Sequence, residues 1–373
     1  MDKTIVLAVA GAGKTYNICE RVNINKKNLI LAFTNENIKN IKNEMNKQYG
    51  EIPKLTEIMT FDSFKYKYLI CPYEPTILEF FNNESFKRRG ITVADPPKQT
   101  IVINGKRVPN KSYYNKNQFK HYINKDNKYY CSNLSELLLQ IKNGKDKLID
   151  RIADNLNNFF DYILIDEFQD FRKHDYDLII ALSKRIDNIV LVGDYYQHSV
   201  SGKNNSGKPF KNGQKFITYK DFIELLKKQK FFVDATSLSG SRRCPRDVCD
   251  FVKEKLNIEI FANNSNKGRI IWVDEDNIDT ILLDDNITKL VLENSKKYSF
   301  KSINWSYSKG DTIRDICVLL TPNFENIDDA SFDINQISQI TKNKIYVALT
   351  RTDRDLYLVK SSVFEKVKSK YVI

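Results

Sequence analysis

The chain has 373 residues, a formal net charge of +12 and 41% hydrophobic residues. This length accommodates two domains with cores of their own, and no apolar run approaches the roughly 20 residues that cross a bilayer, which excludes a membrane-spanning helix. The excess of positive charge favours a polyanionic partner such as nucleic acid. The six cysteines form no CxxC pair, which disfavours a zinc site, and with no signal peptide visible we expect a cytoplasmic protein.

The first predicted element is a buried strand at residues 5–7, which runs into Ala8-Val9-Ala10-Gly11-Ala12-Gly13-Lys14-Thr15. A strand, a turn of small residues, Lys-Thr and then a helix is the arrangement that binds phosphates, because backbone N–H groups and the helix N-terminus converge on the anion. We expect Lys14 to reach the terminal phosphates and the Thr15 hydroxyl to be a ligand of Mg²⁺. The predicted contacts of this phosphate loop come from Ala10, Gly11, Ala12, Gly13, Lys14 and Thr15.

Two more strands are predicted at residues 29–33 and 58–60, with an amphipathic helix between them. Strands that alternate with helices indicate an α/β fold with a parallel sheet. Thr34 and Asn35 follow the first of these strands, and residues 61–64 follow the second. Polar and aromatic residues at the carboxyl ends of such strands lie where parallel sheets bind ligands.

The composition changes from about residue 71 to residue 158, where Lys, Asn and Tyr are abundant and the alternation of strands and helices is lost. We interpret this segment as a basic insert with a small fold of its own. One interpretation is a surface for single strands, in which bases stack on the rings and cations bind the phosphates. The other is a solvated surface whose composition reflects an A/T-biased genome. The sequence favours neither.

The sheet resumes with a predicted strand at residues 162–165, which ends in Asp166-Glu167-Phe168-Gln169-Asp170. Downstream of a phosphate loop, paired carboxylates have a specific chemical use. Asp166 would hold Mg²⁺ together with Thr15, and Glu167 would orient and deprotonate the attacking water. A further strand at residues 189–192 leads to Gln197, which can sense the terminal phosphate. The loop at residues 199–215 is rich in Gly, Asn and Lys and is expected to be mobile.

A second domain is predicted to begin at about residue 230, with a strand at residues 231–233. Arg243 stands before a predicted helix, and further strands are expected at residues 269–273, 290–292, 315–320 and 356–359. The predicted organisation is therefore a first motor domain at residues 1–70 and 159–229, the basic insert at 71–158, and a second motor domain at 230–373.

Taken together in this order, the motifs resemble those of superfamily 1 helicases of the UvrD/Rep type. The match runs from residue 5 to about residue 360 and leaves the insert unmatched. Residues 166–170 resemble the DExQD box of this family, and residues 193–197 resemble its GDxxQ motif. The other similar segments are residues 10–15 (motif I), 33–35 (Ia), 60–64 (Ib), 243–245 (IV), 308–310 (V) and 346–351 (VI).

The resemblance implies two RecA-like domains of the P-loop NTPase type, with Mg-ATP bound between them; ATP rather than GTP is expected by this analogy alone. The implied catalytic residues are Lys14, Glu167, Gln197, Arg243 and Arg351, the two arginines stabilising charge on the transferred phosphoryl group. Asp166 and Gly310 join the cofactor-binding residues of the phosphate loop. The implied nucleic-acid contacts are Thr34, Asn35, Thr60, Ser63, Phe64 and Ser306. Thr60 and Ser63 have an alternative interpretation as turn or cap residues.

The chain departs from the family pattern at several positions. Asp62 stands where motif Ib usually has His, and Asn304, Ser306 and Thr312 stand where motif V usually has Thr, His and Glu. About 50 residues separate motif IV from the approach to motif V, too few for the large regulatory insert of relatives. The pattern indicates a compact member of the family.

Two functional hypotheses follow. The first is an ATP-dependent translocase and helicase that acts on single-stranded DNA or single-strand/duplex junctions, in the 3′ to 5′ direction, with a nuclease or a repair or replication protein as a possible partner. The second is an ATP-gated nucleic-acid-binding subunit, a clamp or sensor in a larger repair or defence complex. A small-molecule phosphotransferase is disfavoured, since neither an acceptor pocket nor a lid is visible.

Overall fold

The computed structural model describes residues 2–83, 85–172, 174–198, 208–213 and 215–373, and it divides into two compact units. The first unit comprises Met1–Ile5, Thr15–Leu191 and Asn204–Phe232. The second comprises Val6–Lys14, Val192–Lys203 and Val233–Ile373. The predicted insert lies within the first unit, and the predicted mobile loop at residues 199–215 falls largely outside the described residues.

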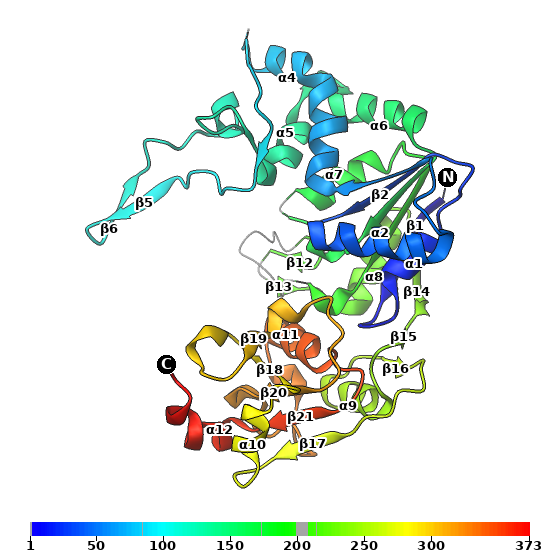
Figure 1. Ribbon diagram of the computed structural model, residues 1–373. Helices are drawn as coiled ribbons and strands as arrows, with labels where there is room; N and C mark the ends of the chain where they lie inside the picture. Colours follow the sequence, from blue (N-terminus) through cyan, green and yellow to red (C-terminus); the bar gives the residue numbers. More distant parts are fainter. Residues whose placement is uncertain (1, 84, 173, 199–207, 214) are drawn as a thin grey trace. The chain divides into compact units, whose positions relative to one another are not determined.

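The first sheet has six strands in the order β14-β1-β11-β10-β2-β3. Figure 1 labels β1, β2 and β14 of this sheet. Strand β10 pairs parallel to β2, and β2 pairs parallel to β3. Every residue of β2 is buried, as are the four residues at the end of β10, because these Leu- and Ile-rich runs are covered on both faces. The strand bounds are Asp2–Ala8 (β1), Asn28–Ala32 (β2), Thr56–Thr60 (β3), Tyr162–Asp166 (β10), Asn188–Gly193 (β11) and Phe232–Leu238 (β14).

Helices and short two-stranded ribbons complete the first unit. Helix α2 packs on β2 and β3, and α5, α6 and α7 pack against one another. The helices are α1 (Lys14–Glu20), α2 (Asn35–Tyr49), α3 (Phe61–Phe64), α4 (Glu74–Phe80), α5 (Leu134–Gln140), α6 (Leu148–Phe159), α7 (Asp175–Leu182) and α8 (Tyr219–Lys228), and a π-helix spans Lys65–Ile70. The ribbons are β4–β7 (Ile91–Thr92, Tyr129–Tyr130), β5–β6 (Thr100–Ile103, Lys106–Pro109), β8–β9 (Lys142–Asn143, Asp146–Lys147) and β12–β13 (Lys211–Asn212, Lys215–Phe216).

The second sheet has five strands in the order β17-β21-β20-β18-β19, and all its pairings are parallel. Its strands are Ile270–Val273 (β17), Thr288–Val291 (β18), Ser302–Asn304 (β19), Ile316–Leu319 (β20) and Leu356–Val359 (β21). A short parallel pair, Gly240–Ser241 (β15) and Phe261–Ala262 (β16), lies apart from this sheet. The helices of this unit are α9 (Arg246–Leu256), α10 (Ile278–Leu283), α11 (Gln339–Leu349) and α12 (Ser361–Val367).

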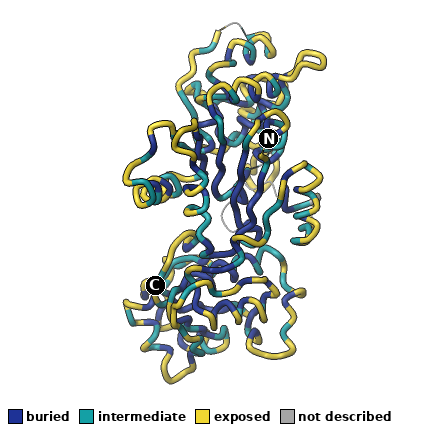
Figure 2. Tube along the Cα trace, turned by 90° about the vertical axis from the view of Figure 1, so that its right-hand side faces the viewer, coloured by how far each residue is buried: buried dark blue, intermediate teal, exposed yellow. Residues whose placement is uncertain are grey.

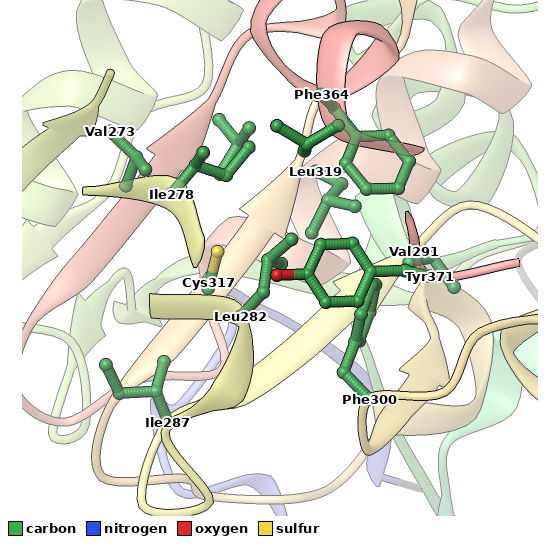
Figure 3. Packing of buried hydrophobic residues seen from close by; sticks show 12 residues of the cluster. Val273, Ile278, Leu282, Ile287, Val291, Phe300, Cys317, Leu319, Phe364 and Tyr371 are labelled. Carbon is green, nitrogen blue, oxygen red and sulfur yellow. The ribbon is translucent and has the colours of Figure 1, made fainter. Parts of the chain in front are cut away.

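One face of the second sheet carries an apolar core that α10 and α12 cover. Figure 3 shows Leu282 of α10 and Phe364 of α12 among the side chains of this cluster, with Cys317 and Leu319 of β20. In each unit the buried residues lie in the interior, and the exposed residues lie toward the outside (Figure 2). All six cysteines are free thiols, and of these only Cys71 is not buried.

The expected α/β class with parallel sheets is confirmed. Most strands lie where the sequence predicts them, because each is a continuous apolar run bounded by polar residues. The strand predicted at residues 231–233 differs: β14 is longer, and it forms the edge of the first sheet instead of opening the second. Its mixture of exposed and half-buried residues is typical of an edge strand. Among the described residues, no helix combines the length and apolar character needed to span a membrane.

Candidate nucleotide site

The predicted magnesium ligands lie together in the first unit. Thr15 is in the first turn of α1, and Asp166 is the last residue of β10. The Thr15 hydroxyl donates a hydrogen bond of 2.9 Å to Oδ2 of Asp166, across 151 positions of sequence. Asp166 is 1% exposed, so its carboxylate is withdrawn from water. A hydroxyl and a carboxylate oxygen are the donors that Mg²⁺ uses at sites where it also binds phosphates, so this pair fits the ion.

Glu167, the predicted base, has an unusual backbone conformation. Its φ of 57° and ψ of 41° place it in the left-handed region, which costs energy for a residue other than glycine. The Glu167 N–H donates to Oδ1 of Asp166 at 2.9 Å, and the Gln169 amide is hydrogen-bonded to Oε2 of Glu167. The turn therefore directs two successive carboxylates differently: Asp166 lies beside Thr15, whereas Glu167 is half-buried and held by Gln169.

The phosphate loop in the second unit leaves no space for a side chain at Gly11. Gly11 and Gly13 have φ values of 72° and 88°. A Cβ on Gly11 would lie 2.6 Å from the Ser241 hydroxyl and 2.7 Å from Cβ of Arg243. The carbonyl of Gly11 accepts a 2.9 Å hydrogen bond from the N–H of Arg242. Glycine at position 11 is thus required both by the backbone conformation and by the adjacent residues 241–243.

Arg242 is a residue of this site that the sequence analysis did not select. Its guanidinium carbon lies 3.5 Å from the position that a Cβ on Gly13 would take. A cation next to a phosphate loop adds to the positive potential that attracts a triphosphate. The available signal was the doubled arginine at residues 242–243, of which only Arg243 matched a motif.

The predicted phosphate sensor, Gln197, is held by the segment that contains it. Gln197 is 3% exposed, and its Nε2 donates to Oδ2 of Asp194 at 2.8 Å. The other oxygen of Asp194 accepts from the Tyr196 N–H at 2.9 Å, which caps a 3₁₀ turn at Tyr195–Gln197. Asp194 also accepts a hydrogen bond from the hydroxyl of Tyr346 on α11 at 3.2 Å. Neither Asp194 nor Tyr346 was given a role from the sequence.

Arg243, predicted to stabilise phosphoryl charge, makes three hydrogen bonds within the second unit. Its Nε donates to the Thr312 hydroxyl at 2.8 Å, Nη1 to the Thr350 carbonyl at 3.1 Å, and Nη2 to the Gly310 carbonyl at 3.3 Å. These contacts give Gly310 a place beside the predicted arginine. The Thr312 hydroxyl orients the guanidinium through its bond with Nε.

Arg351, the second predicted arginine, lies close to Arg243 and is 1% exposed. Its guanidinium donates to the carbonyls of Val347 at 2.8 Å and Ser308 at 3.3 Å and to the Thr350 hydroxyl at 3.3 Å. Burial, together with the positive charge of Arg243, lowers the pKa of Arg351 to about 10. The two arginines are therefore brought together around Thr350, and Arg351 is engaged with carbonyls of its own unit.

The predicted nucleic-acid residues other than Ser306 lie at or just after the ends of strands β2 and β3 of the first unit. Thr34 and Asn35 are exposed, and the Thr34 hydroxyl caps α2 by accepting from the N–H of Asn37 at 3.1 Å. Thr60 caps α3 by accepting from the N–H of Ser63 at 3.2 Å, so the alternative cap interpretation describes a contact that is present.

Two other predicted contacts differ in exposure. Ser306, in the second unit, is half-buried in a 3₁₀ turn. The prediction that Phe64 contacts nucleic acid must be corrected, because this residue is fully buried. The centroid of its ring lies 6.1 Å from that of Phe61 and 6.2 Å from that of Tyr68. An aromatic ring inside the core of the first unit offers no face on which a base can stack.

A family model described as an AAA domain matches residues 2–203, more than half of the 373-residue chain. The chain therefore belongs to this AAA domain family. The match includes the phosphate loop, Thr15, Asp166, Glu167 and Gln197. A search of curated proteins finds no match.

The solved structures that match this chain include arterivirus helicases. Nonstructural protein 10 (helicase) of an arterivirus in complex with DNA is 12% identical, covers 96% of this chain and has a TM-score of 0.46. A second structure, also of an arterivirus nonstructural protein 10 (helicase), is 13% identical with a TM-score of 0.45, and the PRRSV helicase is 11% identical with a TM-score of 0.44. This chain covers 61%, 59% and 54% of those three chains, respectively.

Proposed function

We propose that this protein is a superfamily 1 ATPase of the UvrD/Rep type that moves along single-stranded DNA in the 3′ to 5′ direction and unwinds duplex. The observation that carries the proposal is the 2.9 Å contact between Thr15 and Asp166. It joins the end of the phosphate loop to the acidic strand end, which is the pairing that Mg-nucleotide hydrolysis requires. The strained backbone at Glu167, next to this pair, supports a role for its carboxylate in the same reaction.

In the proposed reaction, the phosphate loop and Lys14 would bind the triphosphate. Thr15 and Asp166 would hold Mg²⁺, which when bound would supply positive charge against the phosphates. Glu167 accepts a proton from water as the water oxygen bonds to the terminal phosphorus. The bond from that phosphorus to the bridging oxygen breaks, which yields ADP and inorganic phosphate. Arg243 and Arg351 supply positive charge for the phosphoryl group in flight. For Arg351 this requires exchanging its carbonyl partners for phosphate oxygens.

The proposed nucleic-acid contacts are Thr34, Asn35, Thr60, Ser63 and Ser306. All five carry small polar side chains that suit hydrogen bonds to phosphate and sugar, and such contacts carry little sequence information. The net charge of +12 adds a sequence-independent attraction. Affinity for a single-stranded oligonucleotide should therefore fall steeply with salt, and duplexes with a tail of either polarity will reveal unwinding and its direction.

One observation favours the second candidate, an ATP-gated nucleic-acid-binding subunit, a clamp or sensor without unwinding of its own. Arg351 is buried and occupied by its own backbone carbonyls, as expected of a protein whose catalytic arginine is withheld. The two candidates differ in the effect of single-stranded DNA on ATP turnover. Strong stimulation supports the motor, whereas unchanged turnover with retained DNA binding supports the clamp.

The test of the proposed chemistry is Glu167→Gln. We expect turnover to fall by about a hundredfold or more, because the amide cannot accept the proton, while Mg-ATP binding is kept. Glu254→Gln is the matched control, since Glu254 lies on the surface of α9 with a side chain 72% exposed, and it should leave turnover unchanged. Undiminished hydrolysis by Glu167→Gln would refute the assignment of the base.

A further inference from the structure

Tyr346 connects three elements that the nucleotide chemistry uses. The N–H of Ala10 in the phosphate loop donates to the Tyr346 hydroxyl at 2.7 Å. The same hydroxyl donates to Oδ2 of Asp194 at 3.2 Å, and this oxygen also accepts from the Gln197 amide. A phenol has one proton, so the acceptor role toward Ala10 and the donor role toward Asp194 fix its orientation.

The helix that carries Tyr346 makes a second buried contact with the same segment. One turn earlier on α11, Nδ2 of Asn343 donates to the carbonyl of His198 at 2.9 Å, and Asn343 is 1% exposed. Residues three apart lie on one face of a helix, so Asn343 and Tyr346 form a single docking face. This face holds α11 against the Asp194–His198 segment.

Arg351 follows directly from this helix. α11 ends at Leu349, and Arg351 bonds back to the carbonyl of Val347 in the last turn. The position of the Arg351 guanidinium therefore depends on how α11 is docked. Burial, and then the negative charge of Asp194, raises the pKa of Tyr346 well above its ordinary value, so the phenol remains protonated and keeps its donor role.

We propose that Tyr346 is a positioning residue that relays occupancy of the phosphate loop to Asp194 and Gln197 and, through α11, to Arg351. The proposal rests on the proposed function and deepens it. A loop amide that shifts when phosphate binds changes its bond to the hydroxyl, and the hydroxyl is the point at which α11 is held to Asp194. Coupling of this kind between sites usually amounts to about 5–150-fold.

The test is Tyr346→Phe in the full chain, which removes the hydroxyl and keeps the ring in place. We expect stimulation of ATP turnover by single-stranded DNA to fall about tenfold or more, while the nucleotide dissociation constant changes less than about threefold. Tyr371→Phe is the matched control, since the Tyr371 hydroxyl donates to Asp279 at 2.8 Å in the same unit and lies among none of the site residues. The control should keep full stimulation.

A second measurement does not depend on turnover. In the wild type, Mg-ATP binding should change amide hydrogen exchange in residues 339–351, and in Tyr346→Phe this change should disappear although nucleotide still binds. Retained stimulation and a retained exchange response in Tyr346→Phe would overturn the relay. The relay would also be overturned if Tyr346→Phe regained stimulation on cooling, over the same temperature range in which it refolds. Such a recovery would mean that the substitution only destabilises the fold.

The two proposals fail differently. If the wild type binds Mg-ATP without hydrolysing it, the motor function is refuted, and the exchange measurement still decides for or against the relay. If the wild type binds no nucleotide at all, both are refuted.

Discussion

Lys65 provides a sharp test of how the first unit is held together. Its ammonium is fully buried and lies 2.9 Å from Oδ1 of Asp175, 3.1 Å from Oδ1 of Asp62 and 3.3 Å from the carbonyl of Cys131. Lys65→Met keeps most of the side-chain volume and removes the charge. Asp175, which is 3% exposed, would then lose its only ion-pair partner among the described residues and keep hydrogen bonds from Ser135 and from the N–H of Arg172.

The expected cost is large because a buried carboxylate is left uncompensated. Breaking a buried ion pair in this way costs about 3–5 kcal/mol. For a unit of this size, about 2–4 °C of melting temperature corresponds to each kcal/mol, so the midpoint should fall by about 6–20 °C. Urea unfolding of the wild type and Lys65→Met measures the loss in free energy of unfolding, and calorimetry measures the fall in melting temperature.

The pH dependence follows from the direction of the two shifts. Burial opposes charge on Lys65, but Asp175 and Asp62 raise its pKa above the ordinary value, so its contribution is complete below about pH 10 and is lost as the pH rises through the folded-state pKa. Burial also opposes charge on Asp62, but Lys65 and Arg172 lower its pKa. Its contribution is complete above about pH 4 and is lost as the pH falls through the folded-state value. The difference in free energy of unfolding between the wild type and Lys65→Met should therefore be constant from about pH 5 to pH 9.

The matched control is Lys67→Met, two residues along the same π-helix. Lys67 pairs with Glu57, but its side chain is 55% exposed, and exposed pairs contribute only about 0–1 kcal/mol. A loss below about 1 kcal/mol for Lys65→Met, no larger than that of the control, would refute the argument that the network supports the unit.

Two further predictions concern the strand ends. Gly11→Ala should abolish binding of a fluorescent nucleotide analogue, because the new Cβ would meet Ser241 at 2.6 Å in a backbone conformation that alanine rarely adopts; near-normal affinity would contradict the described loop. Thr34→Ala should lower the free energy of unfolding by about 1 kcal/mol through loss of the α2 cap, and it should weaken oligonucleotide binding severalfold. Thr34→Ser should keep both the stability and the oligonucleotide affinity of the wild type. An unchanged oligonucleotide affinity in Thr34→Ala would mean that Thr34 serves only as the cap of α2.

The sequence predicted the positions of the strand ends that carry the candidate site, because their geometry follows from the fold. In a parallel sheet the carboxyl ends of neighbouring strands lie at one edge, so Thr34, Thr60 and Asp166 had to lie near that edge. The contact between Thr15 and Asp166 follows from the same rule, although 151 positions separate the two residues.

The sequence did not predict which side chains are buried or how they pair. Phe64 follows a strand as a base-stacking residue would, and only the packing of Phe61 and Tyr68 around it shows that it belongs to the core. Lys65 is an ordinary lysine in the sequence, and its burial depends on two aspartates, one of them 110 positions away. The contacts of Tyr346 with Ala10 and Asp194 join segments that are far apart in the sequence, so the sequence did not single out this residue. Long-range pairings of this kind leave no periodic signal.

The Lys65 network also bears on how this protein can be divided or recombined. Cys131 and Ser135 belong to the segment of unusual composition, whereas Lys65 and Asp175 flank it on either side, and all four meet at one buried charge. If residues 71–158 alone were transferred into a related protein, Cys131 and Ser135 would lose their buried contacts with Lys65 and Asp175. A chimera that keeps its fold must exchange Lys65 and Asp175 together with the segment they anchor.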